Sequence, residues 1–169
     1  PYATLSTASL NEMITKVNKC ADEGRFYIVF NHYVIEEEAL SVKDPDNTLL
    51  VIRTHGITKQ TEKALLDTGC EIVDATCPFV AKIHKIVREH SGRDNVILIA
   101  GDKAHHEVIG ICGNAVDTPT FIYSGVEELE KLMKNHPEFN EKTVIAVAQT
   151  TFNAEIWSEC QKILKKGYT

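Results

Sequence analysis

Cys77 is the residue whose type and position most directly suggest chemistry in this sequence. It follows Ile72-Val73, an apolar pair with the character of a strand end, and precedes Pro78, which suits a first helical position because its missing N–H needs no partner there. At a helix N-terminus the dipole and the unpaired backbone N–H groups favour a thiolate, the form that attacks electrophiles and ligates metals. A buried, unreactive cysteine at a strand–helix junction is the alternative, and the local sequence does not separate the two.

Polar and titratable side chains follow five of the six apolar, β-branched runs that we expect to be strands. The six runs are residues 26–30, 48–52, 71–73, 95–100, 120–123 and 143–148. The segments after five of them are Asn31-His32, Arg53-Thr54-His55-Gly56, Asp74-Ala75-Thr76-Cys77, residues 101–107 and Gln149-Thr150-Thr151. Ligands of open α/β sheets bind outside the carboxyl ends of the strands, so we expect these segments to form one rim.

The residue types on this expected rim favour an anion. Histidines, threonine hydroxyls and helix N-terminal N–H groups can together bind phosphate or diphosphate without a cluster of lysines. Glu107 comes two residues after His105, and a carboxyl beside an imidazole is suited to delivering protons to a reacting ligand. Each segment also has an ordinary explanation: a turn at His55-Gly56, a solvated loop at His105-His106, helix caps at 149–151, and a surface acid at Glu107.

The segments between the expected strands read as helices. Thr58 can cap a helix over 59–68 that stops at Gly69, and Ser124 with Glu127 forms a capping box for another. Asn153 can cap a last helix reaching residue 165, with Cys160 on its apolar side and therefore in the core. One helical face after Pro78 would carry Phe79, Val80, Ile83, Ile86 and Val87. Strands that alternate with helices of these lengths predict an α/β fold with mostly parallel sheets and flanking helices.

Composition narrows the classes of function. The 169 residues carry a net charge of −6, which argues against nonspecific binding to nucleic acid. No apolar run approaches the roughly 18 residues that span a bilayer, and no secretory signal pattern is visible, so we expect no membrane association and a cytoplasmic protein. Five cysteines at wide spacings, without a CxxC pair, argue against a disulfide framework and against a zinc knuckle.

Four motifs, in order, resemble those of the hydroxymethylbutenyl diphosphate reductase family, known as IspH or LytB. The motifs are Arg53-Thr54-His55-Gly56, Asp74-Ala75-Thr76-Cys77-Pro78-Phe79-Val80, His105-His106-Glu107-Val108 followed by Gly110 and Gly113, and Ala148-Gln149-Thr150-Thr151. The resemblance runs from about Thr48 to Lys166. It implies a three-lobed α/β protein with a central 4Fe-4S cluster, one cysteine coming from each lobe. Such an enzyme removes the hydroxyl of an allylic diphosphate as water, giving isopentenyl and dimethylallyl diphosphates in the methylerythritol phosphate pathway. It takes electrons from a donor such as ferredoxin or flavodoxin.

The resemblance also implies roles for single residues. Cys77 would ligate the cluster, and His55 and His105 would hold the diphosphate. His32 is a candidate for the family's earliest diphosphate-binding histidine. Glu107 would supply protons to the departing hydroxyl. Thr150 would lie beside the substrate, supported by Gln149.

The sequence departs from the family pattern in its cysteines. Nothing in residues 1–13 resembles the segment of the first cluster cysteine, and Cys20, Cys70, Cys112 and Cys160 match no ligand position. One thiolate cannot hold a cluster that needs three or four protein ligands, so we expect two lobes, 1–77 and 78–169, without the third. Such a chain would be an inactive fragment or a divergent relative. His106 also replaces an expected proline.

Two further classes of function stay open at this stage. The chain could be a non-redox module that binds diphosphate on its rim without a cluster. It could also be a thiol hydrolase that pairs Cys77 with His55 or His105, although no Asp or Asn is evident to orient the histidine.

Overall fold

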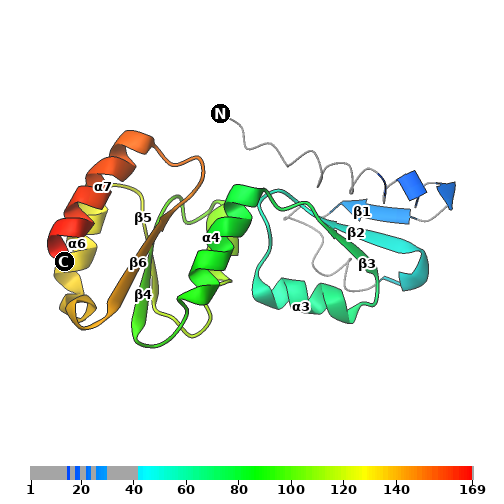
Figure 1. The fold of residues 1–169 in the computed structure, drawn as a ribbon, viewed down its shortest axis with the longest axis horizontal. Coiled ribbons are helices and arrows are strands. Elements are labelled where there is room, and N and C mark those ends of the chain that lie inside the picture. The colour runs from blue at the N-terminus through cyan, green and yellow to red at the C-terminus, as the bar shows by residue number, and fades with distance from the viewer. Residues whose placement is uncertain (1–14, 16–17, 20–21, 24–25, 30–41, 169) are drawn as a thin grey trace. The chain divides into compact units, whose positions relative to one another are not determined.

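The fold is that of a computed structural model, in which residues 15, 18–19, 22–23, 26–29 and 42–168 are described. Contacts divide the chain into two compact units, Pro1–Lys82 and Ile83–Thr169, and the boundary falls inside helix α4 (Pro78–Glu89). Each unit has its own three-stranded parallel sheet (Figure 1). Among the described helices, none is long and apolar enough to cross a membrane.

The first unit is built on a sheet with the strand order β1-β2-β3. Its elements are β1 (Phe26–Val29), the 3-10 turn η1 (Pro45–Asn47), β2 (Thr48–Ile52), α3 (Lys59–Asp67) and β3 (Glu71–Asp74). All five residues of β2 are buried, as a central strand covered on both faces requires. Leu65 of α3 packs on Leu50 and Ile52, so α3 covers one face of this sheet.

Helix α3 begins and ends where its sequence predicts. Thr58 is the N-cap, and its hydroxyl accepts a hydrogen bond from the N–H of Thr61 at 3.1 Å. Gly69 follows the helix with φ +76°, a left-handed conformation that glycine adopts without strain. The N-cap and the glycine set the two ends of α3, and β3 begins two residues after Gly69.

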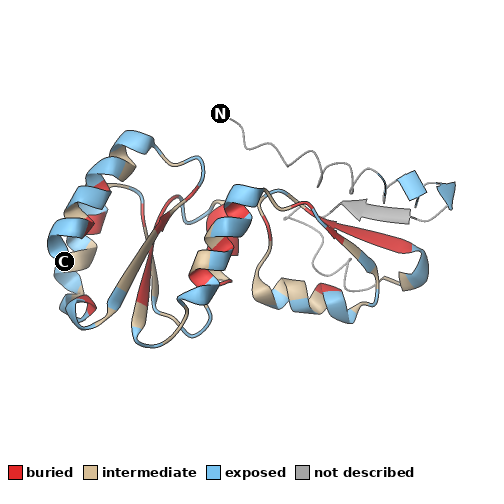
Figure 2. Cartoon of the chain, viewed as in Figure 1, coloured by how far each residue is buried: buried red, intermediate tan, exposed pale blue. Residues whose placement is uncertain are grey.

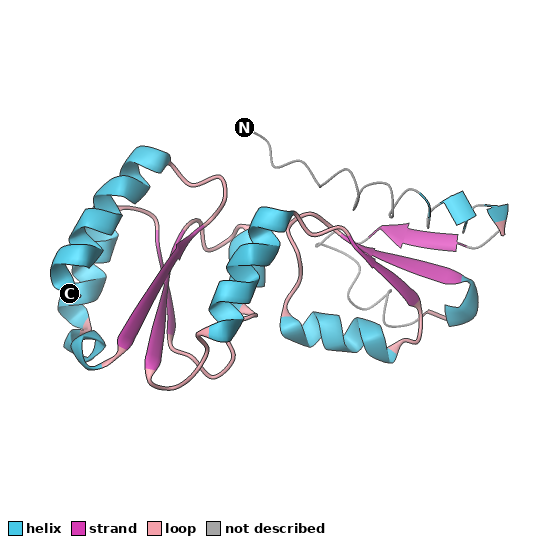
Figure 3. Ribbon diagram, viewed as in Figure 1, coloured by secondary structure: helices cyan, strands magenta, loops and turns pink. Residues whose placement is uncertain are grey.

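The second unit is built on a sheet with the strand order β5-β4-β6. Its strands are β4 (Asn95–Ala100), β5 (Thr120–Tyr123) and β6 (Thr143–Ala148). Its helices after α4 are α5 (His106–Cys112), α6 (Val126–Asn135), the 3-10 turn η2 (Pro137–Glu141) and α7 (Ala154–Gly167). Strands and helices alternate along both units, as Figure 3 shows.

The central strand β4 explains the layering of the second unit, because its side chains alternate between two separate cores. Val96, Leu98 and Ala100 pack in the core formed with α6 and α7. Ile97 and Ile99 point the other way, into the core formed with α5 and the second half of α4. Figure 2 shows β4 buried within this unit, whereas α6 and α7 have exposed outer faces. Helices therefore cover both faces of a parallel sheet, and the predicted α/β class is confirmed.

Two local predictions are wrong. Phe79 lies in the first turn of α4 with its side chain 59% exposed, so it does not share the buried face that carries Val80 and Val87. Ser124 does not form a capping box with Glu127. The N-cap of α6 is Gly125, and both the N–H and the hydroxyl of Ser124 donate to the carboxylate of Glu128, one residue further along.

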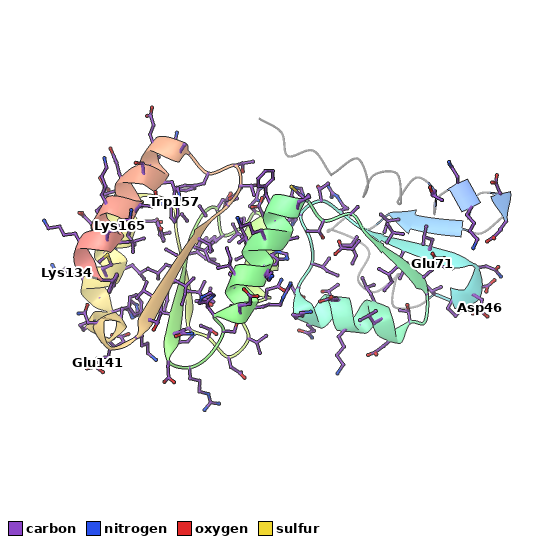
Figure 4. The ribbon with its side chains drawn as sticks, in the orientation of Figure 1. Asp46, Glu71, Lys134, Glu141, Trp157 and Lys165 are labelled. Atoms are coloured by element: carbon purple, nitrogen blue, oxygen red, sulfur yellow. The ribbon has the colours of Figure 1, made fainter. Side chains whose placement is uncertain are left out.

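The core of the second unit can be tested at Leu98, which is completely buried. We expect Leu98→Ala to lower the free energy of unfolding by about 2–5 kcal/mol, because it removes buried apolar surface and leaves a cavity. Val116→Ala, at a side chain that is 53% exposed, is the control and should cost less than about 1 kcal/mol. Urea unfolding followed by the fluorescence of Trp157, which packs against this core from α7 (Figure 4), gives both values. Equal losses in the two variants would contradict the layering.

Candidate functional site

The carboxyl ends of β4 and β6 form the site of the second unit. The chain moves from β4 to β5 on one side and then crosses to β6 on the other side of β4. The strand order therefore reverses between β4 and β6, and such a switch point is where open α/β sheets bind ligands. Glu141, labelled in Figure 4, lies just before β6 and marks the opposite, amino end of that strand.

Glu107 and Thr150 make the central contact of this site. The side chain of Glu107, in the first turn of α5, is only 1% exposed. Its Oε1 accepts a hydrogen bond from the N–H of Thr150 at 2.6 Å, and its Oε2 accepts one from the Thr150 hydroxyl at 2.7 Å. Thr150 itself is exposed. A buried carboxylate is thus connected to the surface through one hydroxyl group.

His105 is the N-cap of α5 and lies beside this pair. Its Nδ1 accepts a hydrogen bond from the N–H of Glu107 at 3.2 Å, so the proton of the neutral ring is on Nε2, which can donate to an anion. The sequence pairs the carboxyl of Glu107 with His105. In the structure the backbone N–H of Glu107 donates to His105, and the carboxylate accepts hydrogen bonds from Thr150. The rings of His105 and His106 have centroids 6.4 Å apart and are tilted by 43°.

Gln149 connects the two loops that carry these residues. It is 8% exposed, and its Oε1 accepts a hydrogen bond from the N–H of Asp102 at 3.1 Å. Its Nε2 donates to the hydroxyl of Thr151 at 2.7 Å. The backbone N–H of Gln149 donates to the carbonyl of Ala100 at 2.8 Å, which extends the β4–β6 pairing by one residue. Both loops are therefore held by specific hydrogen bonds.

The first unit has a second group of candidate residues, at the carboxyl ends of β2 and β3. Asp46 and Glu71, labelled in Figure 4, mark the amino ends of the same strands. The N–H of Cys77 donates to the carbonyl of Thr54 at 2.9 Å, so the two loops are adjacent. His55 and Cys77 are both half-buried, and Gly56 ends the first loop with φ +70°. Cys77 directly precedes α4, as predicted, with Pro78 as the first helical residue.

The other described cysteines pack in or beside the cores. Cys160 is completely buried between α7 and the sheet, which confirms its predicted place in the core. Burial raises the pKa of the Cys160 thiol and of the Cys112 thiol. Cys70 packs beside the core under α3. Within residues 42–168 and the few described positions before them, no three His, Cys, Asp or Glu side chains are grouped as metal ligands. The described residues therefore offer one thiol on a rim, Cys77, and no complete ligand set for a cluster.

The structure groups the predicted site residues into two sets. His55 and Cys77 belong to the first unit, and His105, Glu107, Gln149 and Thr150 belong to the second. Each set lies at the carboxyl ends of the strands of its own sheet, and the single rim stays a prediction. His32 and Cys20 lie outside the described residues. The sequence prediction included Gly101, Asp102 and Thr151 in the rim segments but assigned no role to any of them. No local pattern shows that Asp102 and Thr151 bind the Gln149 side chain.

Comparison with known proteins identifies the family. The sequence model of the LytB protein family matches residues 12–169. The chain belongs to the LytB family. A curated LytB relative from Caldanaerobacter subterraneus subsp. tengcongensis, named 4-hydroxy-3-methylbut-2-enyl diphosphate reductase, is 43% identical over 132 residues. That match covers 78% of this chain and 43% of the relative. A protein of the same name from Nautilia profundicola is 36% identical, with 82% of this chain and 48% of the relative covered.

Two solved structures of LytB enzymes are also similar. One is described as (E)-4-hydroxy-3-methyl-but-2-enyl diphosphate reductase, the terminal enzyme of the non-mevalonate pathway. It is 25% identical with a TM-score of 0.62, and the match covers 92% of this chain and 60% of that chain. The other, a reductase from Plasmodium falciparum, is 27% identical with a TM-score of 0.64, covering 94% and 53%. The chain thus spans less than half the length of these curated relatives and little more than half of the solved structures.

The Glu107–Thr150 contact can be tested by its effect on stability. We expect Thr150→Val to lower the free energy of unfolding by about 1–3 kcal/mol, because it removes a donor from a buried carboxylate oxygen. Thr150→Ser keeps the hydroxyl and should cost less than about 1 kcal/mol. Urea unfolding monitored by Trp157 fluorescence measures both variants. A Val variant as stable as the Ser variant would show that the hydroxyl of Thr150 is not bound to Glu107.

Proposed function

We propose that the protein carrying this chain is a 4-hydroxy-3-methylbut-2-enyl diphosphate reductase. The names of its LytB relatives support this activity, and the contact between Glu107 and Thr150 is the observation on this chain that carries it. The reaction takes two electrons and two protons. The allylic C–O bond breaks, the hydroxyl leaves as water, and a proton added at one or the other allylic carbon gives isopentenyl or dimethylallyl diphosphate.

Glu107 and Thr150 are proposed to deliver the proton to the leaving hydroxyl. Thr150 donates its own hydrogen to Glu107, so its oxygen can accept a hydrogen bond from a substrate hydroxyl at the surface. When Glu107 carries a proton, this hydrogen bond reverses: the carboxyl donates to the Thr150 oxygen, and the Thr150 hydroxyl donates to the substrate oxygen. A proton can then pass along both bonds to that oxygen as the C–O bond breaks. General acid catalysis of this kind is needed because hydroxide is a much poorer leaving group than water.

The diphosphate is proposed to bind the histidines. His105 has Nε2–H as a donor because its Nδ1 is occupied by the backbone of Glu107. His55 would bind the same group from the loop after β2, and His32 remains a proposed ligand outside the described residues. Gln149 would support Thr150 by holding its loop to the loop after β4.

Cys77 is the residue that we propose as a ligand of a 4Fe-4S cluster. When bound, such a cluster supplies the electrons and a Lewis-acidic iron for the substrate oxygen. The described residues do not fit the whole group, because they offer this one thiol on a rim and no grouped set of three ligands. The remaining ligands must come from residues outside the described ones, and an electron donor such as ferredoxin or flavodoxin would reduce the cluster.

A second candidate function rests on the same lack of a grouped ligand set among the described residues. The chain could bind a diphosphate on its rims without redox chemistry. In that case inorganic diphosphate would bind, and anaerobic treatment with iron and sulfide would leave the protein colourless.

The proposed function is tested on the protein isolated from its source under anaerobic conditions, and reconstituted with iron and sulfide. We expect a brown chromophore and reduction of 4-hydroxy-3-methylbut-2-enyl diphosphate by dithionite with a dye mediator. Cys77→Ser should lose both, whereas Cys112→Ser, at a cysteine that lies away from both rims, should keep both. A protein that binds diphosphate but shows neither colour nor reduction would support the second candidate.

Glu107→Gln tests the proton delivery within that assay. We expect kcat to fall by roughly 10²–10⁴-fold with the chromophore intact, because the amide cannot donate a carboxyl proton. Glu127→Gln, at an exposed position on α6, is the matched control and should leave kcat unchanged. Full activity in Glu107→Gln would exclude Glu107 as the acid.

A further inference from the structure

Gly101 directly follows β4 and lies close to Val108 of α5 and to Gln149 after β6. A Cβ atom added to Gly101 would lie 2.7 Å from Cγ2 of Val108, 3.0 Å from Oε1 of Gln149 and 3.1 Å from Cβ of Gln149. Heavy atoms in ordinary van der Waals contact with a Cβ are 3.4 Å away or more. Gly101 is not among the glycines with positive φ, so the need for glycine here comes from space and not from backbone conformation.

The backbone around Gly101 has little freedom to move away. The N–H of Gly101 donates to the carbonyl of Tyr123 at 2.9 Å, and the N–H of Gln149 donates to the carbonyl of Ala100 at 2.8 Å. The end of β4 is therefore held on both sides by its neighbouring strands. Val108 is completely buried in the core under α5. Of the groups around a new Cβ, the carboxamide of Gln149 is the one that can be displaced most easily.

The position of that carboxamide matters for Thr150. Its Oε1 accepts from the N–H of Asp102, and its Nε2 donates to the hydroxyl of Thr151. The carboxamide therefore holds Asp102 in the loop after β4 and Thr151 in the loop after β6. Thr150 lies between Gln149 and Thr151 and donates two hydrogen bonds to Glu107. A shift of the carboxamide by a few tenths of an ångström would strain the hydrogen bond that ties the loop of Thr150 to the N–H of Asp102.

We propose that Gly101 is a positioning residue: its missing side chain is the space in which the Gln149 carboxamide sits, and through Gln149 it holds Thr150 against Glu107. This inference rests on the proposed function for its catalytic consequence, whereas the positioning itself concerns the described residues of the second unit. Gly101 touches no reacting atom. Its role is to keep an exposed hydroxyl in register with a buried carboxylate.

The positioning can be measured without substrate or cluster. The amide proton of Thr150 donates to a carboxylate at 2.6 Å, so we expect a strongly downfield NMR signal that is protected from exchange with solvent. In Gly101→Ala this signal should move upfield and lose protection. Gly125→Ala is the matched control, because it makes the same change at the end of β5 where a Cβ would meet no atom within 4 Å, and it should leave the Thr150 signal in place.

A double variant separates Gln149 from core packing. Gly101→Ala/Val108→Ala removes the 2.7 Å contact with Val108 and keeps the crowding of Gln149. This double variant can therefore replace Gly101→Ala in the NMR measurement if Gly101→Ala alone does not fold. The Thr150 signal should remain shifted in this variant relative to Val108→Ala alone. A return of the signal to its Val108→Ala position would mean that Gly101 acts through Val108, which would overturn the proposal.

The catalytic consequence is measured in the reductase assay on the native, cluster-containing protein. Gly101→Ala should lower kcat by roughly three- to tenfold, less than the hundredfold that a displacement of about 1 Å can cause, because the crowding shifts Gln149 by a few tenths of an ångström. KM should change by less than about threefold, because the ring of His105 keeps its own hydrogen bond to the N–H of Glu107. In a Gln149→Ala background, Gly101→Ala should add less than about a twofold loss, because two residues that act through one contact are not additive.

The outcomes separate the two proposals. If the native protein is active and Gly101→Ala changes neither kcat nor the Thr150 signal, the positioning role is wrong and the proposed function stands. If the native protein has no reductase activity, but the Thr150 signal moves in Gly101→Ala and not in Gly125→Ala, the positioning role stands and the proposed function fails.

Discussion

The parallel pairing of β4 with β6 is the constraint on which the candidate site of the second unit depends. These strands are paired over their whole length, from Asn95 opposite Thr143 to Ala100 opposite Ala148. Because both strands end together, the loops that follow them leave the sheet side by side. A shift of the pairing by one residue would turn the side chains of β6 to the opposite faces and separate Gln149 from Ala100. The apolar faces of β4 and β6 therefore fix the geometry of polar groups that lie beyond the sheet.

Burial makes that geometry specific. Glu107 is the one carboxylate that is buried among the described residues, and a buried charge is costly unless donors surround it. Two donors come from Thr150, which is 43 residues away in sequence, so the fold must close correctly before the charge is compensated. The same requirement makes the loop after β6 stiff, since releasing Thr150 would leave a buried acceptor without its donors. An exposed hydroxyl is thus held in place by a buried carboxyl group.

The elements were predictable where local chemistry decides them. Each of the six expected strands agrees with the structure to within one residue at either end. The ends were predictable because apolar runs are bounded by polar residues and glycine. The caps Thr58 and Asn153 were predictable because their oxygens bind N–H groups two or three residues away. The N-cap of α6 could not be predicted, because Ser124 and Gly125 are both good N-cap residues and the choice between them depends on how β5 ends. Phe79 was misplaced because helical periodicity identifies a face without showing whether anything covers its first turn. The binding partner of Glu107 could not be predicted from the sequence, because no local pattern connects residues 107 and 150.

The two units present different chemistry on similar sheets. The described rim of the first unit holds a thiol and an imidazole, Cys77 and His55, but it has no buried carboxylate. The rim of the second unit holds a buried carboxylate, a hydroxyl and an imidazole, while its described cysteines lie in or beside the cores. Reductive loss of a hydroxyl as water needs electrons from a reductant and a proton at the hydroxyl oxygen. The first rim carries the proposed cluster ligand, and the second rim carries the proposed acid. Neither set of residues alone therefore indicates the whole of the proposed chemistry.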